Sequence, residues 1–191
     1  MGTIQHSSLT TTDLHEPKGV STATVDHIYL ADGLGSGAWV KQKSHIGGYV
    51  SFDSSTPAYS LATGGTSDVV INPTFVGVHA ENFTAQTSPN DRFRYDGTPD
   101  VHAFVNFNCS MKQSSGGTID VEFVVYKNGV AQEGSRVVRS ATSGAWGNVS
   151  LDFDIIMSTN DYLEFFTKTP GGAATILFAQ AYAAVQATAG L

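Results

Sequence analysis

The chain has 191 residues, of which 41% are hydrophobic and only 14% are charged, and its formal net charge is -7. Its 10 Lys and Arg residues are scattered, which argues against nucleic-acid binding, because that requires clustered basic side chains. The single cysteine, Cys109, excludes an intrachain disulfide and a cysteine-rich metal site. The length suits one domain preceded by an arm.

The first residues lack the features of a secretion signal. Met-Gly-Thr-Ile-Gln-His has neither a basic start nor an apolar stretch. No window approaches the roughly 18 apolar residues that a membrane span needs. We therefore expect a protein that is made in the cytoplasm and is not inserted into a membrane.

The N-terminal part of the chain predicts an arm. Residues 1–26 are polar and aperiodic, so they cannot offset their own ordering entropy and are expected to become ordered on a partner. A strand at His27–Ala31, a glycine-rich turn and Trp39 predict a small hairpin, after which Gly47-Gly48 indicate a boundary. The predicted domains are an attachment arm with the hairpin, 1–46, and a β-sandwich, 47–191.

From Tyr49 onward, apolar residues recur with a period of two, which predicts half-buried strands. Alternate residues from Val101 to Met111 are apolar, and Phe104 is the one large apolar residue on the opposite face. Asn128-Gly129 predicts a tight hairpin turn, because both positions tolerate positive φ. Further strands are expected at 119–125, 149–155, 69–78, 91–95, 134–140, 161–168 and 174–187.

The last segment, Ala174–Ala187, is rich in alanine and leaves helix as an alternative to strand. Alternation favours a central strand with one small and one large face. Its large face would hold Ile176, Phe178, Gln180 and Tyr182. Together these patterns predict an all-β, antiparallel β-sandwich with no helix.

No catalytic constellation is visible in the sequence. Cys109 falls on an apolar strand face and is expected to pack as a small hydrophobe. Residues 33–37 lack the following helix of a phosphate loop, so we interpret them as a hairpin turn. The histidines have no ligand-like spacing. They are His6, His15, His27, His45, His79 and His102.

The densest acidic region holds Asp152, Asp154 and Asp161. Paired carboxylates could bind calcium or serve a glycosidase. However, Asp152 and Asp154 alternate with apolar residues, which favours the solvent face of a strand, and Asn160-Asp161 suggests a turn. We expect no enzyme, cofactor or metal, and leave open a structural ion at these three acids.

The segment DLHEPKGVSTATVDHIYLADGLGSGAW, residues 13–39, resembles the N-terminal region of phage virion proteins of the head-decoration, head-fibre and tail-fibre types. In those proteins a pattern DLHEPKGV…A…VYVADG.GSG.W precedes a variable C-terminal domain. The matching positions are 13–20, Tyr29, Ala31, Asp32, Gly33, Gly35, Ser36, Gly37 and Trp39.

The C-terminal part resembles the TNF-like jelly rolls that trimerise in phage fibres and decorations. VHAFVNFNCSM, IDVEFVVYKNGV, NDYLEFFTKTP and ATILFAQAYAAVQA follow that layout in order. The resemblance implies a homotrimer. Three aromatic residues on strands whose other face is already apolar are expected at its interface. They are Phe104, Phe165 and Tyr182.

The two resemblances together imply a trimeric capsid decoration or head-fibre protein on the capsid surface of a virion. Its arm would dock on the major capsid protein. The expected docking residues are Leu14, His15, Glu16, Pro17, Lys18, Gly19, Tyr29 and Trp39.

The alternative is a tail-fibre or receptor-binding protein with host surface glycans as partners. Aromatic candidates for such a binding tip are Phe93 and Tyr95, near Arg92 and Arg94, or Trp146. A third interpretation, a polysaccharide depolymerase, would need a pair of carboxylates in a groove, and the sequence shows none.

Overall fold

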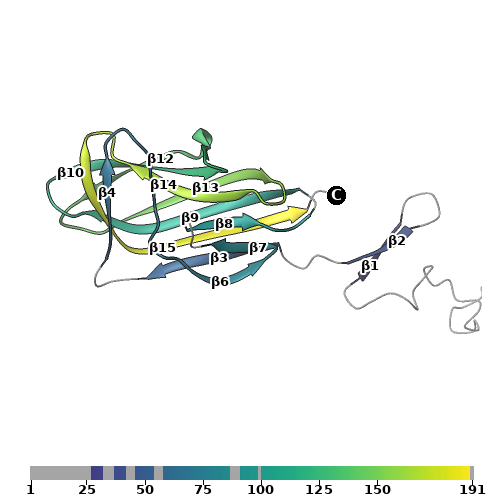
Figure 1. Cartoon of the computed structure of the whole chain (residues 1–191). Coiled ribbons are helices and arrows are strands. Elements are labelled where there is room, and N and C mark those ends of the chain that lie inside the picture. The colour runs from purple at the N-terminus through teal and green to yellow at the C-terminus, as the bar shows by residue number, and fades with distance from the viewer. Residues whose placement is uncertain are drawn as a thin grey trace, which may run out of the picture. The chain divides into compact units, whose positions relative to one another are not determined.

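The computed structural model describes residues 27–31, 37–41, 46–53, 58–86, 91–98 and 100–189. The chain divides into two compact units, Met1–Ser44 and His45–Leu191. In the first unit, β1 (His27–Ala31) pairs antiparallel with β2 (Gly37–Lys41) (Figure 1). Tyr29 lies opposite Trp39, and their ring centroids are 5.4 Å apart. The two strands of the expected hairpin are confirmed, and its turn lies outside the described residues.

The second unit consists of two antiparallel sheets (Figure 1). In the first sheet the order is β13-β9-β15-β3-β6, with β4 also beside β15. In the second the order is β11-β10-β14-β8-β7, with β12 beside β10 and β5 beside β14. The first sheet comprises β3 (Ile46–Asp53), β4 (Tyr59–Gly64), β6 (Val76–Glu81), β9 (Val101–Gln113), β13 (Gly147–Met157) and β15 (Ala173–Ala189). The second comprises β5 (Val69–Val70), β7 (Phe83–Gln86), β8 (Arg92–Tyr95), β10 (Thr118–Lys127), β11 (Val130–Ala131), β12 (Val137–Thr142) and β14 (Tyr162–Lys168).

The connectivity of the main strands is that of a jelly roll. β3-β15-β9-β13 form one sheet, and β8-β14-β10-β12 form the other. Most of these pairs join strands that are distant in the chain, as nested Greek keys require, whereas β10 and β12 follow one another. The antiparallel jelly-roll sandwich expected from the sequence is therefore confirmed. The turn between β10 and β11 also has the expected form, with Asn128 at φ 52° and Gly129 at φ 76°.

Aromatic contacts between the two sheets form the centre of the core. Phe107 on β9 stacks on Phe165 of β14 at 4.7 Å between centroids, and Phe123 of β10 is 6.2 Å from Phe107. Burying each such ring contributes about 1.5–3 kcal/mol. Phe165 is only 3% exposed, so its expected place at a trimer interface is wrong: the ring fills the monomer's own core. Cys109 is also buried there, and burial raises the pKa of its thiol, as for an inert packed cysteine.

A bulge in β15 changes which side chains face the core. Ile176 and Phe178 are buried, but the pairing with β9 shifts between Phe178 and Gln180. One extra residue inverts the alternation of a strand. Gln180 and Tyr182 are therefore exposed, and the expectation that they share a face with Ile176 is wrong. The residues that face the core beyond the bulge are Ala181, Ala183 and Val185.

Two expected strands are interrupted by turns. The segment 69–78 divides into β5 and β6, with Thr74 between them at φ 64°. This conformation is strained for a β-branched residue. Asp91 stabilises the turn, because its buried carboxylate accepts a hydrogen bond from the Phe75 amide at 2.9 Å. The segment 134–140 begins with a 3-10 turn at Glu133–Ser135, so β12 starts only at Val137.

Gly47-Gly48 lies inside β3 and does not form a linker. A Cβ atom on Gly48 would lie 2.7 Å from the carbonyl oxygen of His79 and 3.0 Å from the Cα of Ala80. The missing side chain therefore allows β6 to pair closely with β3. The second unit begins at His45, two residues before the expected start of the sandwich, so these glycines belong to its first strand.

An ion-pair cluster lies on the outer face of the second sheet, centred on Arg136. Its guanidinium contacts Asp68 at 3.1 Å, Glu122 at 3.2 Å and Glu133 at 2.7 Å. Tyr126 donates a hydrogen bond to Asp68 at 2.8 Å. Burial alone raises the pKa of Asp68, but the hydrogen bonds from Arg136 and Tyr126 outweigh it and hold that pKa below its usual value. Burial and the bond to Asp68 raise the pKa of Tyr126 to about 12.

Substitution of Gly48→Ala should destabilise the domain by about 1–3 kcal/mol, because a backbone oxygen occupies the space of the new methyl group. Thermal unfolding followed by circular dichroism measures the change. Gly144→Ala is the matched control, since its Cβ would meet nothing within 4 Å. Equal melting temperatures for the two variants would contradict the close approach of β6.

Substitution of Asp68→Asn should lower the free energy of unfolding at neutral pH by about 1–3 kcal/mol. The lowered pKa means that the carboxylate stabilises the fold above its unfolded pKa, about 4, and loses this effect as the pH falls through the folded pKa. The variant should therefore lose less stability on acidification than the wild type. Urea titrations from neutral to acidic pH measure both effects.

Glu133→Gln is the control for the ion-pair cluster, because its side chain is 67% exposed and should matter little. If Asp68→Asn were as stable as the wild type at neutral pH, the cluster would make no net contribution to stability.

Candidate functional site

The outer face of the first sheet carries exposed apolar side chains on three strands. Phe104 on β9, Ile156 on β13 and Tyr182 on β15 are 45%, 52% and 39% exposed. Phe104 pairs with Gln186 of β15, and Ile156 pairs with His102 of β9. Because paired residues point to the same side of a sheet, these side chains share one surface. We call the outward side chains of β13, β9, β15 and β3 the sheet face.

Polar side chains on the sheet face are already hydrogen-bonded to one another. Asn106 donates to Asp152, and Asn108 donates to Asn106. Ser110 donates to the Asn148 side-chain oxygen at 2.9 Å. The face is therefore neither a plain hydrophobic patch nor a solvated polar surface. A second molecule could cover it without leaving these amides unpaired.

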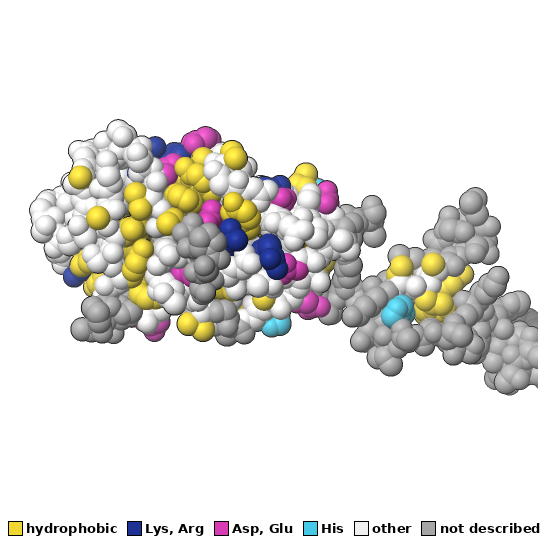
Figure 2. Space-filling view, viewed as in Figure 1, with side chains coloured by type: hydrophobic (Ala, Val, Ile, Leu, Met, Phe, Trp, Pro, Cys, Tyr) yellow, Lys and Arg dark blue, Asp and Glu magenta, His cyan; other side chains and the backbone are white. Residues whose placement is uncertain are grey.

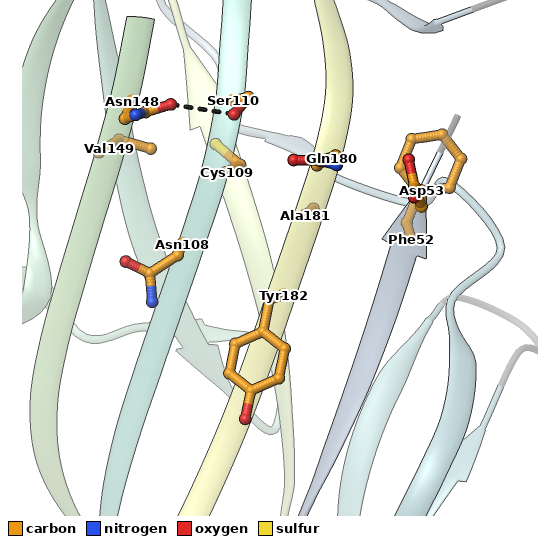
Figure 3. Close-up of a pocket in the computed structure, with 10 residues that line it drawn as sticks. All are labelled: Phe52, Asp53, Asn108, Cys109, Ser110, Asn148, Val149, Gln180, Ala181 and Tyr182. Atoms are coloured by element: carbon orange, nitrogen blue, oxygen red, sulfur yellow. Dashed lines mark hydrogen bonds between the residues drawn. The ribbon is translucent and has the colours of Figure 1, made fainter. Parts of the chain in front are cut away.

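A hollow of about 380 Å³ opens in the sheet face where β15 bulges (Figure 3). Asn148 and Ser110 lie on one side of it, and Tyr182 points along it (Figure 3). Among the described residues that line the hollow, Asp53 is the only charged one, so these residues assemble no pair of catalytic carboxylates. The lining residues are Phe52, Asp53, Asn108, Cys109, Ser110, Asn148, Val149, Gln180, Ala181 and Tyr182.

The structure brings together two of the three expected interface residues. Phe104 and Tyr182 are both exposed on the sheet face, whereas Phe165 is in the core. Ile156 joins them, as a third residue that was not among those expected at the interface. Its signal was a second large apolar residue directly after Ile155, which must point to the opposite side of the strand.

Of the expected docking residues, only Tyr29 and Trp39 lie in the described part of the chain. They form the edge-on aromatic pair across the β1–β2 hairpin. The two strands hold both rings in place, so the pair forms an apolar surface before any partner binds. Binding would therefore cost these side chains little conformational entropy. The others lie outside the described residues: Leu14, His15, Glu16, Pro17, Lys18 and Gly19.

The structure separates the aromatic candidates for a binding tip. Phe93 and Tyr95 are 1% and 0% exposed, because both point into the core, so their expected role is wrong. Trp146 is 44% exposed, and the Lys112 ammonium lies 4.6 Å from the centroid of its ring.

The three acids of the densest acidic region have different environments. Asp152 and Asp154 are exposed along β13. Asp161 instead closes the turn before β14, accepting a hydrogen bond from the Ser158 amide at 2.7 Å and pairing with Lys127 at 2.7 Å. Within the described ranges, no group of three or more His, Cys, Asp or Glu side chains is arranged to hold a metal ion.

The described chain has no helix of the length and apolar character that crossing a membrane requires. No known family model and no curated protein matches the sequence.

Solved structures with a similar fold come from different sources. Eiger TNF from S. frugiperda is 10% identical, with a TM-score of 0.46 over 77% of this chain and 94% of that one. The PRD1 vertex protein P5 is 13% identical, with a TM-score of 0.43 over 75% and 96%. Murine APRIL is 12% identical, with a TM-score of 0.42 over 73% and 98%. Each is a similarity of fold.

Proposed function

We propose that this chain is a structural protein of a phage virion, a homotrimer of jelly rolls that decorates the capsid through its N-terminal 46 residues. The observation that carries the proposal is the sheet face, a large surface with exposed Phe104, Ile156 and Tyr182 on a folded domain. The resemblance of residues 13–39 to the attachment segments of virion proteins supports a location on the virion.

A closed trimer accounts for the chemistry of the sheet face. Its apolar side chains favour burial, which contributes about 25 cal/mol for each Å² removed from water. Its amides are bonded within the protomer, through Asn106, Asn108 and Asp152, so covering them carries a small penalty. A cyclic assembly covers the same face on every copy and leaves no contact that propagates.

Attachment through the N-terminal part accounts for the Tyr29–Trp39 pair. Trp and Tyr are the residue types that dominate binding energy at interfaces. Three arms from one trimer, each with modest affinity, would bind a repeating capsid surface tightly through avidity. The major capsid protein is the proposed partner. The role is structural and requires no catalysis.

A second candidate function is receptor binding by a tail fibre, and the exposed indole of Trp146 favours it. The copy number in purified virions distinguishes the two. A decoration protein covers the capsid in many copies, whereas a tail fibre is present in few.

Deletion of residues 1–26 should abolish binding to the capsid and leave the trimer intact, because the sheet face belongs to the other unit. Co-sedimentation with undecorated capsids measures binding, and light scattering measures the oligomeric state. The docking role is wrong if the shortened protein still trimerises and still decorates capsids.

The double substitution Phe104→Asp and Ile156→Asp should convert the trimer to monomers, since each protomer would bring two new charges into the buried face. Size-exclusion chromatography with light scattering gives the mass. Val130→Asp is the control, because Val130 is 64% exposed on the second sheet and should leave the trimer unchanged. A trimeric double variant would show that another surface mediates assembly.

A further inference from the structure

The four turns at one end of the sandwich carry no charged residue of their own. The segments 61–67, 113–119, 141–149 and 169–179 contain no Asp, Glu, Lys, Arg or His. Hydrogen bonds join them: the Ser114 amide donates to Thr175 at 2.9 Å, and the Ser143 hydroxyl donates to Gly116 at 2.6 Å. We call this end, with its four turns, the loop end. It lies on the left in Figure 2, where most of the surface is neither charged nor hydrophobic.

The loop end contains a cavity of about 350 Å³ where β4, β9 and the start of β15 meet. This volume is at the lower end of the range for small-molecule sites. Hydroxyl, amide and methyl groups line it, and no charged side chain does. The lining residues are Ala62, Thr63, Gln113, Ser114, Ser115, Ala173, Ala174 and Thr175.

Gln113 gives this cavity an unused hydrogen-bonding group. Among the described residues, its side-chain oxygen is the buried side-chain polar atom that has no hydrogen-bond partner. An unpaired buried carbonyl is costly, so it is expected to serve a purpose such as binding. Rotation of the amide would direct a donor or an acceptor to a hydroxyl group in the cavity.

Trp146 lies on the other side of the β9 terminus from this cavity. Trp146 directly precedes β13, and β13 pairs with β9 there through Gly147 and Met111. The cavity lies on the side of β9 that faces β15, where Ile176 pairs with Gln113. Lys112, which contacts the indole, is the residue before Gln113. An exposed aromatic ring and a hydroxyl-lined cavity thus flank the end of β9.

We propose that the loop end binds a neutral oligosaccharide. The apolar face of one sugar ring stacks on Trp146, while the hydroxyls of another bond to Gln113, Ser115 and Thr175. Among the described residues, the lining has no cation to hold a phosphate or a carboxylate and no carboxylate to hold an amine. The Lys112 ammonium at this end is held over the Trp146 ring. Its hydroxyl and amide groups equally disfavour an apolar ligand, which would leave them unpaired.

The direction in which the loop end points on a virion rests on the proposed function, whereas the existence of the binding site does not. β3 begins at Ile46, opposite Ala187, and Gly64 lies opposite Ala173 at the other end of β15. At about 3.3 Å per residue, roughly 45 Å of strand separates these two ends. A trimer attached by its N-terminal residues would therefore carry the loop ends at its outer tip.

The test is binding of the full-length protein to an array of neutral and sialylated glycans. One arm of the array carries bacterial O-antigen polysaccharides, and the other carries mucin-type O-glycans. We expect binding to a neutral glycan in one arm, which identifies the source. Binding should fall at least tenfold in Trp146→Ala and in Gln113→Leu, a loss of about 1.4 kcal/mol or more.

Gln132→Leu is the matched control for Gln113→Leu, because Gln132 follows β11 on the second sheet, at the opposite end of β10 from the loop end, and should leave glycan binding unchanged. Thr175→Val is a second variant in the cavity. Valine is favourable in a β-strand, so this substitution removes one hydroxyl group and retains the shape of the side chain. Thermal unfolding checks that each variant folds, and Gln113→Leu should melt no lower than the wild type.

Three results would overturn the inference: no glycan binding by the wild type, binding only to sialylated glycans, or full binding by all three variants at Trp146, Gln113 and Thr175. Capsid co-sedimentation, run in parallel, tests the proposed function independently of glycan binding. A protein that binds glycans but not capsids retains the site and loses the decoration role.

Discussion

The exposure of side chains on the first sheet depends on the bulge in β15. This strand has 17 residues and pairs with β9 along one side and with β3 and then β4 along the other. Without the extra residue at Ala179, Tyr182 would point into the core and Ala181 would point outward. The bulge therefore exposes an aromatic ring on the sheet face and leaves small residues inside, where they fit against the rings of the second sheet.

The sequence was sufficient to predict regular alternation and local turn chemistry. Val101–Met111 and the Asn128-Gly129 turn have the expected structure because each is determined by neighbours in the chain. The bulge depends on how β15 pairs with distant strands, so the residues around Ala179 carry no sequence pattern that predicts it. Phe165 and Phe166 show a second limit, because adjacent aromatic residues point to opposite sides. Phe165 entered the core, while Phe166 stacks on Tyr126 at 3.9 Å between centroids.

The same limit applies to the candidate sites. Phe104 was visible in the sequence because it interrupts a polar face, whereas the residues that line the hollow and the loop-end cavity come from separate strands and form no motif. Gln113 became notable only when packing buried its amide oxygen without a partner. Composition does carry a signal of the loop end, since four separate turn segments lack charged residues. The topology shows that these turns meet at one end.

The sheet face and the loop end impose opposite demands on one domain. In the proposed trimer the sheet face loses water, and hydrogen bonds within the protomer already satisfy the side-chain amides of Asn106 and Asn108. A surface that binds a glycan must instead keep polar groups available, and the side-chain oxygen of Gln113 has no partner within the chain. Because long strands separate the two surfaces, we expect a substitution at the loop end to leave the proposed assembly unaffected. On this proposal the loop end could vary while the assembling face and the attachment segment stay constant.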